Sequence, residues 1–422
     1  MISFLKSLIT RLRGNEFVRN TAILSLGTAF AQGLNILAMP ILSRLYTPAD
    51  FGLLAIFVAV SSIVATSITL RYETAILLPK RDQEAKSLMG LSALLVFFGS
   101  IFFTVTAYLL PLSLKKSFGI EILENWLMSA IFCGIATSLV AIGTGWYNRN
   151  KSYKNIATLR IVQSSVSISV SLLLGIWGVA TGMMMAQLVA FSFVAFYVIW
   201  SLKSIYSRGN NFDFMEVAKK HSAAPKYLLP TSLLDVVTLH LPIFLITAWF
   251  STETAGQFSM AWKILGLPSG LIGGAIGQVF YQKFSVLWPD SLACKKLLTN
   301  TWTTLALIGF IPMLVIIFFG VEIFSFFLGS AWEEAGSIAS IIAPMLFLML
   351  ISSPTSGTYL VLGMQKRSLL FGISVLIYRP VCIYMGFFYQ NLTYGLIALV
   401  FAEIVQISLY QILAFKKIEG VL

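Results

Sequence analysis

The chain has 422 residues, of which 58% are hydrophobic and only 11% are charged, and its mean hydropathy is +0.86. A soluble globular protein has roughly 25% charged residues, so this composition excludes a soluble domain with an ordinary water-facing surface. The net charge of +12 does not indicate nucleic-acid binding, because the cations gather in short turns between apolar segments. We therefore expect a protein that crosses a lipid bilayer many times and binds no nucleic acid.

Twelve apolar segments are long enough to cross a hydrocarbon core of about 30 Å as helices. Before them, residues 1–14 (MISFLKSLITRLRG) are basic and amphipathic, which predicts a helix lying at the membrane interface. The segments cover residues 20–43, 50–72, 86–110, 122–146, 155–177, 179–202, 227–250, 255–282, 298–322, 335–361, 368–389 and 392–415. The sequence therefore predicts an all-α polytopic membrane protein with twelve transmembrane helices.

A polar and basic break at 203–226 divides the twelve segments six and six. We expect an N-terminal lobe at 1–205, a cytosolic linker at 206–226 and a C-terminal lobe at 227–422. The halves share an aromatic residue, a short turn containing threonine and then a glycine, Gly52 in one half and Gly256 in the other. Since each half has an even number of helices, the two would be parallel repeats, as in transporters with two rocking lobes.

The cations also predict the orientation. With a cytosolic N-terminus, 23 of the lysines and arginines lie on the cytosolic side, against Arg44, Lys115 and Lys116 outside. Cytosolic loops carry the excess of lysine and arginine in membrane proteins, so both termini should be cytosolic.

Motifs for catalysis are absent from the sequence. It contains no phosphate-binding P-loop, and His221, His240 and three cysteines do not have the spacing of a metal site. No extracytosolic loop is large enough for the catalytic site of a membrane polymerase or ligase. We expect neither a cofactor nor a metal, and no enzymatic activity.

Away from the ends of the apolar segments, five charged residues fall inside them: Arg160, Lys263, Arg379, Asp235 and Glu403. Each costs about 2.5–3.5 kcal/mol at the bilayer centre, so it should face protein or water rather than lipid. Arg379 and Glu403 are each 12 residues from Asn391, at one depth of a helical hairpin. They could form an ion pair, or Arg379 could line a cavity and serve an anionic ligand; both interpretations remain open at this stage.

The remaining candidates are weighed in the same way. Lys263 has no obvious partner, because Asp235 lies nearer the cytosolic side, whereas Arg160 could extend to the interface. Arg71 and Glu73 are two residues apart and would point to different faces of a helix, which favours distinct roles over mutual neutralisation. Gly266, Gly270 and Gly274 recur at helical spacing and favour a closely packed face, with a bendable gate helix as the alternative. The surplus of cations at membrane depth suits a phosphate-bearing substrate, since guanidinium binds phosphate in a bidentate fork.

Four stretches resemble the O-antigen flippases of Wzx type, polysaccharide-export proteins of the multidrug/oligosaccharidyl-lipid/polysaccharide transporter superfamily. The stretches are RNTAILSLGTAFAQGLNILAMPILSRLYTPADFGLLAIF (19–57), RYETAILLPKRDQEA (71–85), GTGWYNRNKSYKNIATLRIVQS (143–164) and residues 224–284, from APKYLLPTSLLD to QVFYQKF. Together they cover nearly half of the chain, and their order and spacing are also similar to the family.

The resemblance implies twelve helices in two six-helix lobes around a central cavity. It implies transport of an undecaprenyl-pyrophosphate-linked oligosaccharide repeat unit across the bacterial inner membrane, for lipopolysaccharide or a similar surface polysaccharide. Cavity cations would attract the pyrophosphate, a role carried onto Arg71, Arg160, Lys263 and Arg379, while Asp235, Glu403 and Glu73 would form ion pairs or couple transport to protons. The partners implied are the lipid-linked oligosaccharide, the bilayer, a polysaccharide polymerase and a chain-length regulator.

Three alternatives remain. A cation-coupled multidrug exporter of the same superfamily should carry acidic residues along the cavity of its first lobe, and this lobe has no acidic residue in the middle of its membrane segments. A polymerase or ligase should have a large outside loop, and a lipid-II-type flippase usually has helices beyond twelve.

Overall fold

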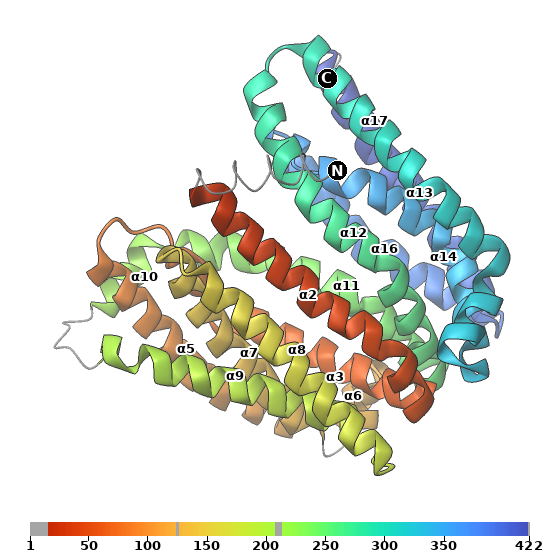
Figure 1. Ribbon diagram of the computed structural model, residues 1–422, viewed down its shortest axis with the longest axis horizontal. Helices are drawn as coiled ribbons and strands as arrows, with labels where there is room; N and C mark the ends of the chain where they lie inside the picture. The colour runs from red at the N-terminus through yellow and green to blue at the C-terminus, as the bar shows by residue number, and fades with distance from the viewer. Residues whose placement is uncertain (1–15, 124–125, 207–212, 421–422) are drawn as a thin grey trace, which may run out of the picture. The chain divides into compact units, whose positions relative to one another are not determined.

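The computed structural model describes residues 16–123, 126–206 and 213–420, and within them every regular element is a helix (Figure 1). The interfacial helix expected at 1–14 lies outside the described residues. Twelve of the described helices have 20 residues or more: α2 (Glu16–Leu45), α3 (Pro48–Ile68), α5 (Asp82–Leu109), α7 (Trp126–Arg149), α8 (Tyr153–Ile176), α9 (Gly182–Tyr206), α11 (Leu229–Trp249), α12 (Thr252–Leu287), α13 (Ser291–Leu328), α14 (Glu333–Ser352), α16 (Gln365–Phe388) and α17 (Leu392–Ile418).

Each of the twelve predicted apolar segments coincides with one of these helices, so the prediction of an all-α polytopic membrane protein is confirmed. Eleven of the helices are long and apolar enough to cross a membrane. The twelfth, α12, contains Lys263 and several glycines but is 36 residues long. Short helices lie between the long ones: α4 (Tyr72–Ala75), α6 (Leu112–Ser117), α10 (Phe214–Lys220) and α15 (Thr358–Val361).

Several long helices begin at a polar side chain that caps them. The Ser251 hydroxyl accepts a hydrogen bond from the Thr254 backbone N–H at 3.0 Å, and the Asp290 carboxylate accepts one from the Ala293 N–H at 3.0 Å. The Asn391 side chain does the same for Thr393. Such caps satisfy N–H groups that have no partner within the helix, and they set where α12, α13 and α17 begin.

The described residues divide into two compact units. The first contains the described parts of 1–46, 56–114 and 122–236, and the second contains 47–55, 115–121 and the described part of 237–422. The division therefore falls inside α11. The lobe and linker boundaries drawn from the sequence stay predictions.

In the first unit, α2 and α8 run parallel along their length, and Figure 1 shows them side by side. A Cβ added to Gly27 would lie 2.5 Å from the Ala157 Cβ, so the two backbones touch there. Further along the pair, the Tyr46 hydroxyl donates to the Ser171 carbonyl at 2.7 Å. Small residues allow this close approach, as is common for helices packed within membranes.

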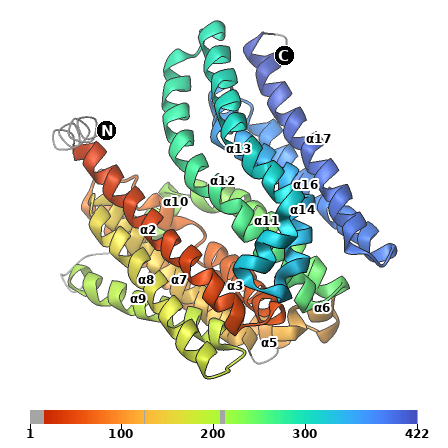
Figure 2. The same ribbon diagram turned by 45° about the vertical axis from the view of Figure 1, so that its right-hand side comes forward.

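In the second unit, α16 packs against α17 and α13 against α14 (Figure 2). The first turns of α3 also belong to this unit, where they meet the start of α12. A Cβ on Gly256 would lie 1.8 Å from the Pro48 carbonyl oxygen, and one on Gly52 would lie 1.9 Å from the Thr252 carbonyl oxygen. The two glycines that correspond in the halves of the sequence therefore pack against one another, and neither position can hold a side chain.

The glycine pattern of α12 has a different outcome. A Cβ added to Gly266, Gly270 or Gly274 would meet nothing within 4 Å. The prediction of a closely packed face at these three positions is therefore wrong. Regular spacing places the glycines on one face of α12, but it does not supply a neighbouring helix on that face.

Candidate functional site: charged side chains within the membrane helices

Arg379 and Glu403 form an ion pair between α16 and α17. Arg379 Nε lies 2.7 Å and Nη2 2.6 Å from Glu403 Oε1. Both residues are buried, with 7% and 4% of their surface exposed. A charged pair at this depth neutralises both partners, so the hairpin geometry expected from the sequence is realised in the structure.

Arg379 also binds a third helix. Its Nη1 donates to the backbone carbonyl of Thr238 on α11. In a helix that carbonyl would accept from the N–H four residues later, but this residue is Pro242, which has no N–H. Arg379 therefore supplies the hydrogen bond that the proline removes, because a backbone carbonyl without a donor is costly inside a membrane. The Trp262 ring lies 6.0 Å from its guanidinium carbon, which leaves Arg379 enclosed by protein.

Lys263, one residue beyond Trp262 on α12, differs from Arg379 in both exposure and contacts. Its side chain is exposed, although it lies in the middle portion of a 36-residue helix. Among the described residues, no hydrogen bond or ion pair involves its ammonium group. A lysine at such a position needs water or an anion to stabilise its charge.

Arg71 and Glu73 form an ion pair, with Arg71 Nη1 3.1 Å from Glu73 Oε1. The prediction that they point to different faces is wrong, because the chain is not helical at Arg71. Helix α3 ends at Ile68, and Leu70 and Arg71 both have positive φ angles, 50° and 64°. This left-handed turn brings the guanidinium back over Glu73, which also accepts from the Thr69 hydroxyl.

The Arg71–Glu73 pair leaves part of the arginine available. The Arg71 side chain is 30% exposed, whereas that of Glu73 is 6% exposed. Two adjacent non-glycine residues in left-handed conformation are uncommon and are associated with functional segments. Arg71 therefore lies half-buried at the end of α3, partly neutralised.

Arg160 on α8 is exposed, and its Nη1 donates to the Thr28 hydroxyl of α2. No acid pairs with it among the described residues. Asp235 is exposed on α11 in the first unit. Arg44 lies exposed in the last turn of α2.

The structure thus sorts the predicted site residues by unit. Arg71, Glu73, Arg160 and Asp235 belong to the first unit. Lys263, Arg379 and Glu403 belong to the second. Of the four predicted substrate-binding cations, Arg379 is buried and paired with an acid, Arg71 is partly paired, and Arg160 and Lys263 are exposed without an acid partner among the described residues.

Sequence reasoning missed the polar groups that flank these charges. Asn35 on α2 donates to the Ser164 hydroxyl on α8 at 3.1 Å, beside the Thr28–Arg160 contact. Two glutamines, Gln32 and Gln163, lie on the same pair of helices. Uncharged polar residues in apolar segments were the available signal, and a search restricted to ionisable residues does not detect them.

A second missed cluster holds the linker to the first unit. Glu84 Oε1, at the start of α5, lies 2.7 Å from Lys220 Nζ and 2.8 Å from His221 Nε2. Nearby, Arg149 Nη2 lies 2.9 Å from Asp82 Oδ1. The contacts of Glu84 join the end of α10 to the start of α5, and the Arg149–Asp82 contact joins the end of α7 to the same start. All of them lie outside the apolar stretches, where such loop charges are expected.

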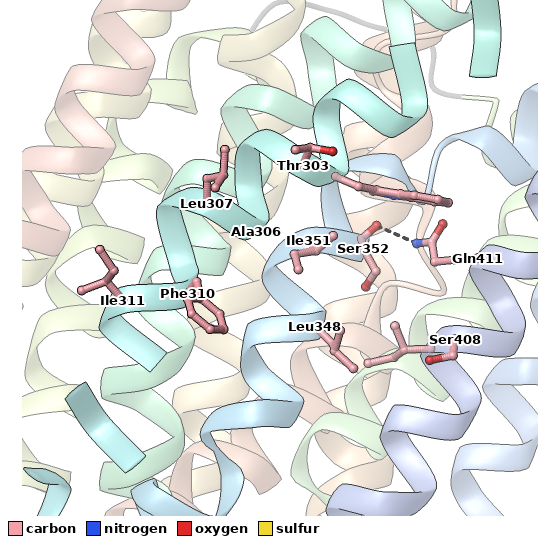
Figure 3. A pocket seen from close by; sticks show the side chains of 12 residues that line it. Thr303, Ala306, Leu307, Phe310, Ile311, Leu348, Ile351, Ser352, Ser408 and Gln411 are labelled. Atoms are coloured by element: carbon pink, nitrogen blue, oxygen red, sulfur yellow. Dashed lines mark hydrogen bonds between the residues drawn. The ribbon is translucent and has the colours of Figure 1, made fainter. Parts of the chain in front are cut away.

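A pocket of about 650 Å³ lies in the second unit between α13, α14 and α17. Figure 3 shows Leu307, Phe310 and Leu348 on its walls, and Gln411 bonded to the Ser352 carbonyl at one end. The lining contains no charged residue and none of the predicted site residues. Its apolar chemistry suits a hydrocarbon chain and does not suit a pyrophosphate, so this pocket is not the predicted cationic site.

These observations define a class: a multi-pass helical membrane protein whose long helices carry two exposed cations, Arg160 and Lys263, that no acid among the described residues pairs with. In agreement, the solved structure titled "Inward-facing conformation of a multidrug resistance MATE family transporter of the MOP superfamily" matches 95% of this chain and 98% of its own, with a TM-score of 0.76 and 16% identity. The inward closed conformation of the lipid II flippase MurJ matches 94% of this chain and 89% of its own, with a TM-score of 0.70 and 17% identity.

A third structure, a MOP superfamily transporter from Pyrococcus furiosus whose title reports reverse polarity of the binding pocket, matches 97% of each chain with a TM-score of 0.52 and 14% identity. At these identities the likeness concerns the fold. No curated protein matches the chain by sequence.

The family is shown by sequence. A family model described as "Polysaccharide biosynthesis protein" matches residues 41–337, which is well over half of the chain. The chain belongs to this family, and the predicted relationship to a polysaccharide biosynthesis family is confirmed.

Proposed function

We propose that the protein is a flippase that moves an undecaprenyl-pyrophosphate-linked oligosaccharide repeat unit across the bacterial inner membrane, with both termini in the cytosol. The product would feed the synthesis of O-antigen or a similar surface polysaccharide. Support comes from the polysaccharide biosynthesis family and from the fold shared with a lipid flippase and with multidrug transporters.

The observation that carries the proposal is the state of Lys263. An exposed, unpartnered ammonium within a membrane helix needs an anion or water, and a pyrophosphate supplies several acceptor oxygens. Arg160 and the exposed part of Arg71 add donors in the first unit. Arg379 is assigned a structural role instead, because it is buried, its charge is paired with Glu403 and its Nη1 donates to the Thr238 carbonyl.

Transport then requires no covalent change in the substrate. The polyprenyl tail stays in the bilayer while the anionic head group exchanges its hydration for fixed donors on the protein. Alternating access would present these donors to one leaflet and then to the other. Asp235 and Glu403 are the groups within the spans whose protonation could couple transport to an ion gradient, and a polymerase and a chain-length regulator would use the product.

A multidrug exporter is the second candidate, because the MATE transporter shares the fold. A cationic drug should be attracted by acids within the helices. Away from their first turns, the helices of the first unit from α2 to α9 carry no aspartate or glutamate, while Arg160 lies in α8. Asp235 on α11 is an exposed acid of this unit within a span, and the exposed cations Arg160 and Lys263 outnumber it, which favours an anionic substrate over a cationic one.

The test uses a strain deleted for the gene and complemented with variants, in which surface glycan and lipid-linked intermediates are measured. We expect deletion to abolish the glycan and to trap single lipid-linked repeats on the cytosolic leaflet. Lys263→Ala should lower export at least tenfold, because a hydrogen bond to a charged group is worth about 1.5–3 kcal/mol. Lys263→Arg should retain most export.

Lys296→Ala is the matched control, since Lys296 is also an exposed lysine of the second unit but lies in the cytosolic first turns of α13. Normal export by Lys263→Ala would contradict the cationic site. Normal glycan in the deletion strain together with increased sensitivity to cationic drugs would favour the exporter. Single repeats accumulating on the outer leaflet would place the defect in polymerisation.

A further inference from the structure

The contact between α2 and α8 carries a polar face inside two apolar helices. Thr28 meets Arg160, and one to two turns further Asn35 meets Ser164. These hydrogen bonds join the helices within the first unit. Polar side chains at this depth would be unfavourable against lipid, so the face must be turned to protein, water or a ligand.

Two glutamines lie on this face but take no part in the described hydrogen bonds between α2 and α8. Gln32 follows Thr28 by four residues and Gln163 follows Arg160 by three, so each lies one helical turn beyond a residue of the same contact. Gln32 is exposed and Gln163 is half-buried. Within the described part of the chain neither amide has a hydrogen-bond partner, so both retain two N–H donors and a carbonyl acceptor.

Arg160 adds further unused donors. Its only protein hydrogen bond among the described residues is the one from Nη1 to Thr28, and a guanidinium has five N–H groups in a planar fork. The face therefore presents an exposed cation, an amide one turn beyond it on α8 and a second amide one turn beyond its hydrogen-bond partner Thr28 on α2. Arg160 suits a phosphate, whereas the glutamine carbonyls require a ligand that also donates hydrogen bonds.

We propose that Gln32 and Gln163 form a sugar-binding subsite, in which the amides bind hydroxyl or acetamido groups of the sugar next to the pyrophosphate while Arg160 binds the phosphate. The inference rests on the proposed function and adds the part of the substrate that this face recognises. Sugar hydroxyls both donate and accept hydrogen bonds, which matches the amides. An ionised phosphate only accepts and would leave both carbonyls unsatisfied.

The test compares two lipids that differ only in the sugar: undecaprenyl pyrophosphate and undecaprenyl-pyrophosphoryl-N-acetylglucosamine. Binding to the full-length protein in lipid nanodiscs would be measured for the wild type and for Gln32→Leu/Gln163→Leu. We expect the wild type to bind the sugar-bearing lipid at least tenfold more tightly. The double variant should lose this preference and keep its affinity for the sugar-free lipid within about twofold.

Ser169→Leu is the matched control, because Ser169 is exposed on α8 and lies half a helical revolution from Arg160; it should behave as the wild type. If the double variant does not fold, Gln32→Ala alone, at an exposed position, replaces it. This variant should lower the preference for the sugar-bearing lipid about threefold. Equal wild-type affinity for the two lipids would overturn the sugar subsite while leaving the proposed function intact. The same conclusion would follow if the double variant lowered the affinity for both lipids by the same factor. If the wild type binds neither lipid, the proposed function fails and this inference with it.

Discussion

The buried pair of Arg379 and Glu403 gives the sharpest prediction about stability. Arg379→Met keeps an unbranched aliphatic stem and removes the charge. It therefore leaves Glu403 buried without its partner and removes the hydrogen bond that Arg379 donates to the Thr238 carbonyl. Breaking a buried pair in this way costs about 3–5 kcal/mol, and a backbone carbonyl left unsatisfied adds about 1–3 kcal/mol. We expect a loss of about 4–8 kcal/mol, which is a large fraction of the stability of most proteins.

Compensating substitutions should recover this loss in two separate steps. Arg379→Met/Glu403→Leu removes both charges, so the remaining cost should be close to that of the Thr238 carbonyl alone, about 1–3 kcal/mol. Adding Pro242→Ala restores the N–H that this carbonyl lacks, so the triple variant should regain most of the remainder. Pro242→Ala in the wild type should not raise the stability in this way, because Arg379 already donates a hydrogen bond to the Thr238 carbonyl.

The free energy of unfolding would be measured by equilibrium denaturation of the purified protein in mixed micelles, followed by tryptophan fluorescence. The reasoning would be refuted if the charge-free double variant lost as much stability as the sum of the two single variants. Export by the double variant tests its function independently. A double variant that is stable but does not export would show that Arg379 serves the substrate.

Three further predictions concern packing, backbone and the linker. Gly256→Ala should lower the free energy of unfolding by about 1–3 kcal/mol through overpacking. Gly266→Ala, where the added Cβ meets nothing within 4 Å, should raise it by about 0.5–1 kcal/mol. Equilibrium unfolding in micelles measures both. Gln390→Gly should stabilise the protein by about 1 kcal/mol, because its φ of 53° is strained for a residue other than glycine. Gly178→Ala, at a φ of 73°, should destabilise it by a similar amount. If the two substitutions changed the free energy of unfolding in the same direction, backbone strain at these positions would be contradicted. Glu84→Gln should speed amide hydrogen exchange in α10 about two- to fivefold, since it weakens contacts worth about 0.5–1 kcal/mol.

The number of long helices was predictable because the bilayer imposes a length and a composition on each of them. The segment 50–72 shows where this approach stops. Its apolar run continues past Ile68, but the helix ends there and the chain turns through Leu70 and Arg71 with positive φ. Hydropathy has no term for backbone conformation, so the helix was extended over Arg71 and the pairing with Glu73 was missed.

The ion pair of Arg379 was within reach of sequence reasoning because its partner lies on the next helix at the same depth. The third contact was not, since Thr238 is 141 residues away and its role depends on a missing N–H at Pro242. A proline four residues after a carbonyl, together with a buried arginine elsewhere, is a signal that could be sought in other membrane sequences. The unpaired glutamines could likewise be found by counting neutral polar residues in apolar segments.

The fate of each charge in the second unit decides which ligand this unit attracts. Arg379 and Glu403 cancel one another within 2.7 Å, and both are buried, so neither contributes a charge that a ligand would meet. Lys263 is exposed and is not cancelled by any described residue, so the membrane-embedded part of this unit presents a net positive charge. At an effective dielectric constant near 20, an anion 4 Å from such a charge gains about 4 kcal/mol, and a cation loses as much. Lys263→Glu should therefore lower the export of an anionic substrate more than Lys263→Ala does. Equal export by the two variants would show that the charge of Lys263 does not act on the substrate.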